Sequence, residues 1–222
     1  LEELETRRVQ LNNQQMGIKI LLNSMYGAMA NEYFQFFHNN TAEAITLSGQ
    51  LTIQWAEKHV NKYLQKVMND DKDRIIAIDT DSIYVCLDDF VNKFVDDTNA
   101  EKCTQFIDKM AQEAIEPVLE KCFDKLAKYL SAYDQKMVMK REVIASKVIF
   151  TGKKKYIANV INNEGVQYAK PKMKITGIES VRSSTPQVCR KMIEDSLDII
   201  MNQDEITLQE YVKENREQFR TL

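Results

Sequence analysis

Residues 74–87 read Arg-Ile-Ile-Ala-Ile-Asp-Thr-Asp-Ser-Ile-Tyr-Val-Cys-Leu, two apolar runs on either side of a short acidic centre. The apolar runs are rich in β-branched residues, which favours a buried β-hairpin with residues 79–82 (DTDS) at its tip. Because side chains two residues apart share one face of a strand, Asp79 and Asp81 are expected to project together from the edge of a sheet. The stretch therefore predicts two antiparallel strands that carry a pair of carboxylates.

Two carboxylates held this close repel each other unless a cation neutralises their charge. Mg²⁺ suits such a pair, because it needs only one or two protein carboxylates when phosphates and waters complete its shell. An isolated D-x-D pattern is more often an ordinary acidic turn. The apolar flanks of this one favour the metal-binding interpretation.

The composition limits the class of protein. The chain has 222 residues, of which 44% are hydrophobic and 28% charged, as in a globular protein with one sizeable core or two small ones. Its four cysteines are far apart and form no C-x-x-C pattern, which is typical of reduced thiols and argues against a disulfide framework or a zinc site. No apolar run is long enough to span a membrane.

Charges are segregated along the chain. Acidic residues predominate between positions 88 and 124, and basic residues predominate between positions 136 and 174. This pattern suggests one face suited to polyanions and another kept away from them. Two solvated faces of opposite sign explain the charges equally well.

The first 31 residues have a helical pattern. Residues 1–15 are polar and are expected to form the exposed end of a helix that begins before this chain does. Lys19, Asn23 and Tyr26 are spaced by four and three, so they fall on one side of the helix. A cation, an amide and a phenol in this arrangement could hold a phosphate and pack on a base, although a solvated polar stripe is the simpler interpretation of these three residues. A separate apolar stripe consists of Ile18, Leu21, Leu22, Met25, Ala28 and Met29.

A second long helix is expected after an aromatic connection. Residues 31–40 (NEYFQFFHNN) are expected to form a strand and a turn, with His38 in a structural role. Thr41 is expected to cap an amphipathic helix that continues to Met68. The expected buried stripe of this helix is Ala44, Ser48, Leu51, Trp55, Ala56, Val60, Tyr63 and Val67.

Downstream of the hairpin, residues 99–132 have a helical pattern that Pro117 divides into two pieces. Its expected core positions are Phe106, Met110, Ala114, Val118, Cys122, Leu126 and Leu130. From position 136 the period becomes that of strands. The expected strands are 137–144, 147–151 and 155–161, followed by a hairpin turn at 162–165.

Two further segments stand out near the end. Residues 152–156 (GKKKY) combine phosphate attraction with a stacking surface, although basic runs are also common on plain surfaces. Residues 183–186 (SSTP) are expected to start a helix with a hydroxyl cap and to continue to about Asn202. Another helix is expected over residues 208–219.

In this order, the segments resemble the motifs of family B DNA polymerases, in particular the branch found in T-even-type bacteriophages. Residues 19–27 (KILLNSMYG) resemble the second polymerase motif, residues 79–82 the third, and residues 154–156 (KKY) the K-x-Y motif. Residues 177–179 (GIE) followed by 183–186 resemble the palm-to-thumb junction. The resemblance covers essentially the whole chain.

The resemblance implies an α+β fold, in which helices back an antiparallel palm sheet. It implies that residues 1–31 are the end of the fingers, residues 32–177 the palm and residues 178–222 the start of the thumb. The implied activity is that of a DNA-directed DNA polymerase, in which two Mg²⁺ ions support nucleotidyl transfer from a dNTP to a primer 3′-hydroxyl.

The resemblance also implies roles for single residues. Asp81 would be the main metal ligand, and Asp79 would have a weaker metal-ligating or electrostatic role. Glu142 matches an acidic position near the metals, but Lys140 stands where a second acid is expected, so metal binding by Glu142 stays open. The implied nucleotide-binding residues are Lys19, Asn23 and Tyr26, and the implied DNA-binding residues are Lys153, Lys154 and Tyr156.

One departure from the family pattern affects the expected activity. The first polymerase motif, with an Asp that completes the metal site, does not occur in these residues, and neither do a proofreading domain or most of a thumb. We therefore expect a truncated chain or a split-gene product that needs the remainder of the polymerase. The implied partners are primer–template DNA, dNTPs and a sliding clamp, in the cytoplasm of an infected bacterial host and without a membrane.

Two other functions remain open. A non-catalytic DNA-binding or assembly module could keep polymerase motifs as relics, but it would be free to lose Asp79, Asp81, Lys19 or Tyr26, and all four are present. An RNA-copying enzyme with a similar palm would account for the acidic hairpin but not for the pattern of residues 19–27.

Overall fold

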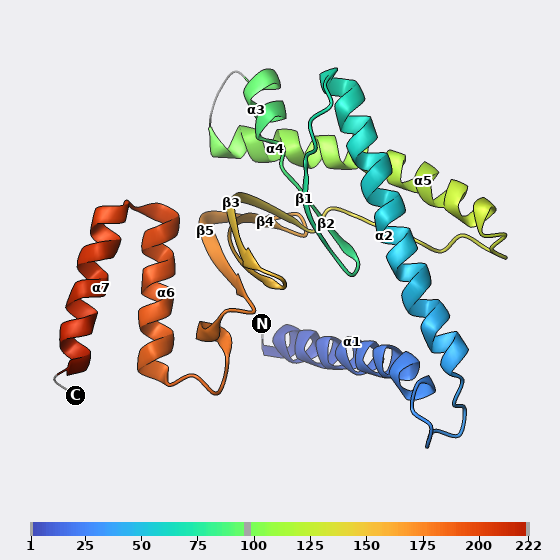
Figure 1. Cartoon of the computed structure of the whole chain (residues 1–222), viewed down its shortest axis with the longest axis horizontal. Helices are drawn as coiled ribbons and strands as arrows, with labels where there is room; N and C mark the ends of the chain where they lie inside the picture. The colour runs from blue at the N-terminus through green and yellow to red at the C-terminus, as the bar shows by residue number, and fades with distance from the viewer. Residues whose placement is uncertain (1, 96–98, 221–222) are drawn as a thin grey trace.

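The computed structural model describes residues 2–95 and 99–220. Helices lie at both ends of the chain, and two small antiparallel sheets lie between them, which confirms the predicted α+β class (Figure 1). The elements in chain order are α1 (Glu2–Met29), α2 (Asn39–Met68), β1 (Ile75–Asp79), β2 (Ser82–Val85), α3 (Asp88–Phe94), α4 (Ala100–Met110), α5 (Glu116–Tyr129), β3 (Val143–Gly152), β4 (Lys155–Asn163), β5 (Val166–Thr176), α6 (Gln187–Asn202) and α7 (Glu205–Arg220).

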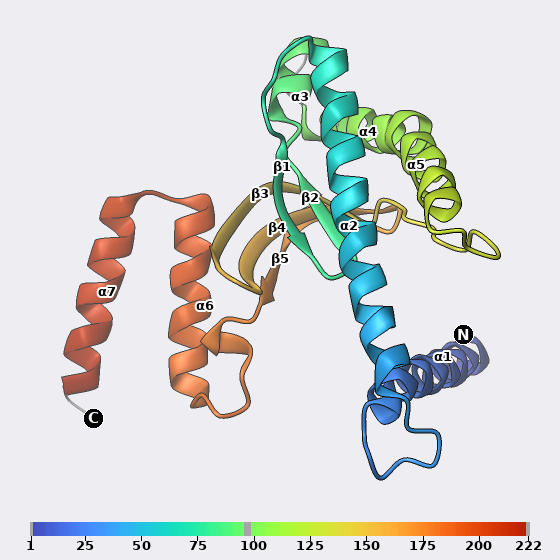
Figure 2. The ribbon, with the colours of Figure 1, turned by 45° about the vertical axis from the view of Figure 1, so that its right-hand side comes forward.

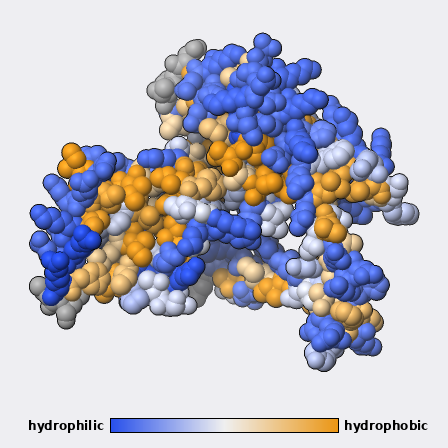
Figure 3. All heavy atoms as spheres, in the orientation of Figure 1, coloured by the Kyte–Doolittle hydropathy of each residue, from blue (hydrophilic) through white to orange (hydrophobic). Residues whose placement is uncertain are grey.

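Helix α1 is a single long helix, as predicted, and residues 3–27 are exposed along it. Its principal contacts are with α2, and Ala28 and Met29 near its end are half-buried. Ile18, Leu21 and Leu22 of the apolar stripe are each more than half exposed. Hydrophobic surface is accordingly visible along α1 in the space-filling view (Figure 3).

The connection between α1 and α2 differs from the prediction. Residues 30–38 form turns and no strand, so the predicted strand is wrong. The predicted cap is also wrong, because α2 begins at Asn39 and His38 is its N-cap residue. The Nδ1 atom of His38 accepts a hydrogen bond from the backbone N–H of Thr41 at 3.2 Å. An imidazole nitrogen therefore satisfies the free amide that a hydroxyl was expected to satisfy.

Helix α2 supplies one side of the larger core. Ala56, Val60 and Leu64 are buried against Leu119 and Phe123 of α5. The predicted stripe is right for Ala56 and Val60 but wrong for three positions, since Ala44, Ser48 and Val67 are exposed. Figure 2 shows the reason, because the first turns of α2 extend beyond α5 and its neighbours.

The helical region after the hairpin is divided as predicted. A π-helical segment (Ala111–Ile115) separates α4 from α5, and Pro117 lies in the first turn of α5, where a missing N–H is tolerated. Cys122 and Leu126 are buried as predicted, whereas Leu130 lies after the end of α5 and is exposed. The short helix α3 was not predicted.

The second sheet has the strand order β3-β4-β5, with antiparallel neighbours. The predicted strand over 137–144 is wrong, because residues 135–142 are irregular and β3 is one strand from Val143. Side-chain bonds replace strand pairing there, since the Arg141 guanidinium contacts Asp108 and donates to Asn162 Oδ1 at 2.7 Å. The predicted hairpin turn at 162–165 is confirmed by the pairing of Asn163 with Val166.

A smaller core joins this sheet to the C-terminal helices. Ile157 and Ile178 are buried with Leu197 and Met201 of α6, and α7 packs on α6 (Figure 1). Helix α6 ends at Asn202 as predicted, but its N-cap residue is Pro186 and no side chain caps it, so the predicted hydroxyl cap is wrong. Among residues 2–95 and 99–220, no helix has both the length and the apolar character that crossing a membrane requires.

The hairpin formed by β1 and β2 is anchored at its base by Arg74. This side chain is only 2% exposed, donates to both Asp70 oxygens at 2.8 and 2.6 Å, and lies 3.4 Å from Asp89 of α3. Its backbone N–H donates to Asn61 of α2, and its carbonyl accepts the N–H of Cys86. One residue thus ties the end of α2, both strands and α3 together.

The turn between β3 and β4 is anchored by Gly177. The φ angle of Gly177 is +68°, a left-handed conformation, and a Cβ atom at this position would overlap with the carbonyl oxygen of Lys154. Two residues later, Glu179 accepts a hydrogen bond from Lys155 Nζ at 2.8 Å. The turn that carries the three lysines is therefore fixed to the segment that leads into α6.

The hairpin anchor predicts a pH-dependent stability. The hydrogen bonds from Arg74 lower the pKa of Asp70 from 3.8 to about 2, so the ionised form stabilises the fold above pH 4 and this contribution is lost as the pH falls towards 2. Arg74→Met should lower the urea midpoint at pH 7 and flatten its dependence on pH between 4 and 2. Lys72→Met, which removes only the exposed Lys72–Asp89 pair, should change the midpoint much less. Equal effects of the two variants would contradict this account.

Gly177→Ala should destabilise the fold by roughly 3 kcal/mol, because it adds a left-handed alanine and displaces the Lys154 carbonyl. Gly165→Ala is a matched control, since Gly165 also has a positive φ of +86° but has open space around it. The control should cost only about 1 kcal/mol, for the backbone conformation. Urea unfolding followed by circular dichroism measures both, and equal losses would show that the close contact is unimportant.

Candidate functional site

The tip of the β1–β2 hairpin presents the two predicted carboxylates. Asp79 ends β1 and pairs with Ser82, which leaves Thr80 and Asp81 as a two-residue loop. Asp81 therefore lies in the turn, and the expectation that it shares a strand face with Asp79 is wrong. The turn is tight, because Thr80 has a φ of +56° and the N–H of Asp81 donates to the carbonyl of Asp79 at 2.7 Å. Both carboxylates nevertheless sit at the same tip, which was the functional part of the expectation.

The basic turn approaches this acidic tip. Lys154 Nζ lies 3.7 Å from Asp79 Oδ1, and the two side chains are 63% and 41% exposed. Lys154 itself has a φ of +60°, so the turn brings its side chain round to the hairpin side. Figures 1 and 2 show the hairpin lying across the β3–β5 sheet, which is the arrangement that brings the two turns together. Segments 79–81 and 153–155 are thus neighbours in space.

Aromatic rings fill the contact behind the two turns. The Tyr84 ring of β2 lies 5.2 Å from the Phe150 ring and 5.6 Å from the Tyr156 ring, measured between centroids. Phe150 and Tyr156 are themselves 5.6 Å apart and pair across β3 and β4. These edge-on contacts fix the hairpin on the sheet. Sequence reasoning identified Tyr156 alone of the three.

The two tyrosines have opposite pKa shifts. Burial raises the pKa of Tyr84, and a hydrogen bond with Tyr156 and the charges of Asp79 and Glu142 act in the same direction. Burial also raises the pKa of Tyr156, but hydrogen bonds with Thr176, Tyr84 and Lys174 outweigh it and leave that pKa lowered. The opposite directions of the two pKa shifts follow if the Tyr84 hydroxyl donates a hydrogen bond to the Tyr156 oxygen. Such a bond stabilises the neutral form of Tyr84 and the ionised form of Tyr156.

Lys174 and Thr176 are members of this group that sequence reasoning missed. Thr176 pairs with Tyr156 across β4 and β5, and Lys174 pairs with Ala158 on the same face. The signal was present in the sequence, because lysine occupies every second position from Lys170 to Lys174. Only the strand register shows that this alternation faces Tyr156.

The predicted nucleotide-binding residues are not brought to the tip. Lys19, Asn23 and Tyr26 are exposed on α1, whose principal contacts are with α2. In Figure 1, α1 runs below the hairpin tip, on the side towards which the tip points.

Glu142 is exposed and directly precedes β3, where its carbonyl accepts the N–H of Glu164. Its charge, like that of Asp79, contributes to the raised pKa of Tyr84. Within residues 2–95 and 99–220, however, no group of three or more carboxylate, imidazole or thiol side chains is arranged to hold a metal ion. The hairpin supplies two hard oxygen donors of the kind that Mg²⁺ prefers, and the described chain supplies no third beside them.

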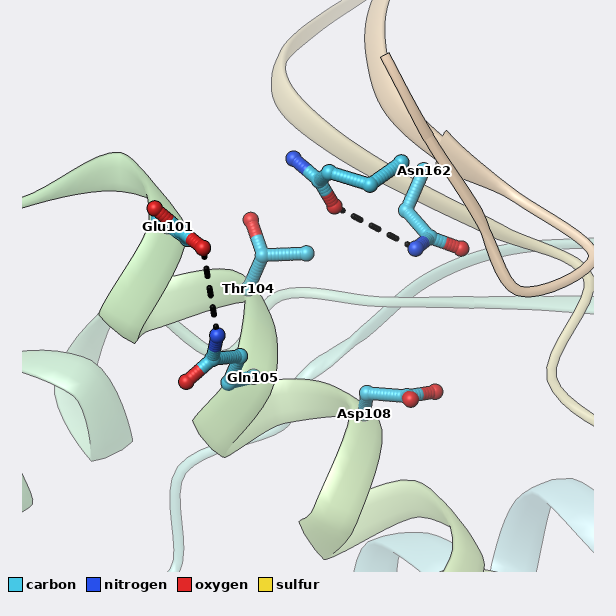
Figure 4. Close-up of a pocket in the computed structure, with 6 residues that line it drawn as sticks. Glu101, Thr104, Gln105, Asp108 and Asn162 are labelled. Atoms are coloured by element: carbon cyan, nitrogen blue, oxygen red, sulfur yellow. Dashed lines mark hydrogen bonds between the residues drawn. The ribbon is translucent and has the colours of Figure 1, made fainter. Parts of the chain in front are cut away.

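Two small pockets lie elsewhere. One, of about 160 Å³, lies between α4 and the β4–β5 hairpin and is lined by polar side chains, including Asp108 and Asn162 (Figure 4). The other, of about 170 Å³, is largely apolar and lies between α2, the end of α5 and the loop after it. None of the candidate residues lines either of these two pockets.

Several known DNA polymerases are similar in sequence to this chain. The DNA-directed DNA polymerase of Enterobacteria phage T4 is 35% identical over 100% of this chain, and that of Escherichia phage RB69 is 39% identical over 86%. DNA polymerase beta of African swine fever virus is 24% identical over 91%. The chain spans 26%, 22% and 16% of these relatives, respectively.

The family described as DNA polymerase family B matches residues 2–221, which is nearly the whole sequence. Both phage relatives exceed 30% identity over most of the chain. This chain therefore belongs to DNA polymerase family B and is close to the enzymes of T-even-type phages.

Proposed function

We propose that this chain carries the palm part of a DNA-directed DNA polymerase, the surface on which a primer 3′-hydroxyl attacks a dNTP. The observation that carries the proposal is the 3.7 Å approach of Lys154 to Asp79. It joins an acidic tip suited to divalent cations to a basic turn suited to phosphates, from segments about 75 positions apart in the sequence. In this division, residues 1–31 belong to the fingers, 32–177 to the palm and 178–222 to the thumb.

The two carboxylates have different surroundings and so different proposed roles. Asp81 is exposed at the loop, and its Oδ1 atom accepts a long 3.4 Å bond from Ser82, so it is available as the main metal ligand. Asp79 accepts a bond from the Thr80 hydroxyl at 3.1 Å and faces Lys154, so its role is weaker and partly electrostatic. Glu142 is further from a ligand role, since it lies before β3 and not in the tip.

The metal site would be completed by a carboxylate outside these 222 residues. Two Mg²⁺ ions, when bound, would activate the primer 3′-hydroxyl and stabilise the leaving pyrophosphate. Asp81 and Asp79 would hold them, while Lys153, Lys154 and Tyr156 keep the primer end beside the tip. Lys19 and Asn23 would contact the triphosphate from α1, and Tyr26 would pack beneath the nascent base pair.

The proposal extends to partners and place. The polymerase would act on primer–template DNA with dNTPs, together with the remainder of the enzyme from the same gene or from a partner chain, and with a sliding clamp. It would work in the cytoplasm of a phage-infected bacterium. A non-catalytic DNA-binding or assembly module is the second candidate, because the described residues offer only two carboxylates at the tip.

The catalytic role of Asp81 can be tested by primer extension. The chain is mixed with the upstream part of a related phage polymerase, Mg²⁺ and the four dNTPs, and association of the two pieces is checked by gel filtration. Asp81→Asn should lower extension at least about 100-fold, because one lost metal ligand removes several kcal/mol of transition-state stabilisation. Asp71→Asn, in the exposed turn after α2, should leave extension unchanged.

Two outcomes would contradict the proposal. Full activity of Asp81→Asn would show that this carboxylate is not a catalytic ligand. Associated pieces that bind DNA but extend no primer would favour the non-catalytic module.

The lysines of the β3–β4 turn are expected to differ in DNA binding. Lys155 is engaged by Glu179 at 2.8 Å, whereas Lys154 has only a long, exposed ion pair that a phosphate can replace. Lys154→Gln should therefore reduce the slope of log K against log salt by about 1, and Lys155→Gln by much less. Fluorescence anisotropy with a labelled primer–template duplex measures the slopes. A larger effect of Lys155→Gln would contradict this assignment.

A further inference from the structure

Of the lysines on β5, Lys174 belongs to the group around Tyr156, and Lys170 and Lys172 have no role in the site described so far. Strand β5 is at the edge of its sheet, with β4 on one side. Lys170, Lys172 and Lys174 are all exposed, and residues 166–176 contain no acidic residue. These lysines could form part of a binding surface, or they could prevent the edge strand from pairing with another chain.

The strand register shows that the two faces of β5 have different surroundings. Met173 and Ile175 point to the face that packs on α6, where they join the core around Ile157. Lys172 and Lys174 alternate with them and share the opposite face with Val160 and Ala158 of β4. That opposite face is the one that carries Tyr156 and meets the β1–β2 hairpin. The lysines therefore begin beside the candidate site and lead away from it.

Lys174 is the lysine of β5 that lies next to the site. It contributes to the lowered pKa of Tyr156, which lies diagonally opposite on the same face of the paired strands. A diagonal neighbour on the same face of two paired strands is within reach of a long side chain, so the register and this contact agree. Lys174 thus adds a positive charge to those of the three lysines in the β3–β4 turn.

The second lysine is paired with an aromatic ring. Lys172 Nζ lies 4.4 Å from the centroid of the Tyr168 ring. The pairing of β4 with β5 is irregular between Val160 and Asn162, and Tyr168 is one of the extra residues of β5 at this irregularity. The Tyr168 side chain is half-buried, and aromatic rings with cations beside them occur on surfaces that bind nucleic-acid strands.

We propose that Lys174, Lys172 and Tyr168 form a second nucleic-acid contact, which follows the sugar–phosphate backbone away from the Asp79–Lys154 tip. The proposal rests on the proposed function, because it places a DNA end at that tip. Lys172 and Lys174 are two strand residues apart, about 7 Å, which matches the axial rise of about two nucleotides of one strand. The surface is therefore spaced to meet phosphates two nucleotides apart on one strand.

A rival explanation exists for lysines on an edge strand. Charged residues and a proline, here Pro171, prevent an exposed edge from pairing with another chain. This protective role would make removal of the lysines promote aggregation without changing how DNA binding depends on salt. The two explanations therefore differ in a measurable quantity.

The test is DNA binding by the 222-residue chain, measured by fluorescence anisotropy with a labelled primer–template duplex between 50 and 200 mM KCl. The variant is the double substitution Lys172→Gln/Lys174→Gln. Lys121→Gln/Lys125→Gln is the matched control, since it removes two exposed lysines from α5. Circular dichroism and light scattering establish that each variant is folded and monodisperse.

The double β5 variant should have a slope of log K against log salt that is smaller by about 2 than that of the wild type. Between 50 and 200 mM KCl, the loss of affinity of the variant should therefore be about tenfold smaller than the loss of the wild type. The α5 control should keep the wild-type slope. Tyr168→Leu should weaken binding, whereas Tyr168→Phe, which keeps the ring, should not. Neutral methylphosphonates can replace single phosphates near the primer end. Where the replaced phosphate is one that Lys172 or Lys174 contacts, the β5 substitutions should have no further effect on binding. These phosphates should lie further from the 3′ end than the phosphates for which Lys154→Gln loses its effect.

The outcomes separate this proposal from the proposed function. If the wild type binds and Lys154→Gln lowers its slope while the β5 variant matches the wild type, the β5 surface is refuted and the function stands. Aggregation of the β5 variant with an unchanged slope assigns the lysines to edge protection. If the wild type shows no salt-dependent DNA binding, both proposals fail.

Discussion

The buried guanidinium of Arg74 is the interaction on which the arrangement of the site depends. It binds Asp70 at the end of α2 and approaches Asp89 at the start of α3, and its side chain lies against the Phe90 ring. The hairpin leaves this point as two strands with a two-residue loop. Because Arg74 fixes the base of the β1–β2 hairpin, the tip with Asp79 lies across the β3–β5 sheet. A buried charge with good partners costs desolvation but defines one geometry.

A second constraint fixes the opposite side of the site. Gly177 allows the Lys154 carbonyl to approach where any side chain would collide, and the Lys155–Glu179 pair holds the next residue. Ile178, between them, is buried in the core shared with α6. The turn between β3 and β4 is therefore connected to α6 through packed residues. A movement of α6 would change the distance between Lys154 and the acidic tip, which links the thumb to the chemistry in the proposed function.

The sequence predicted elements where local pattern decides, and failed where tertiary contacts decide. The hairpin at residues 75–85 and the helices α1, α2 and α6 follow from periodicity and turn residues. The strand expected over 137–144 is absent because Arg141 makes side-chain bonds to α4 and β4 in place of a ladder. Tyr156 and Lys154 could be named from the KKKY motif, but Lys174 required the register of β5 against β4, which no local pattern contains.

The central claim is that the acidic tip and the basic turn form one site for a divalent cation and phosphates. Paramagnetic line broadening by Mn²⁺ in amide NMR spectra tests it most directly, because even weak binding is detected by position. We expect broadening first at residues 79–82 and then at 153–156, and we expect Asp81→Asn to remove it. Broadening confined to the acidic surface of α4 and α5, with residues 79–82 unaffected, would contradict the claim.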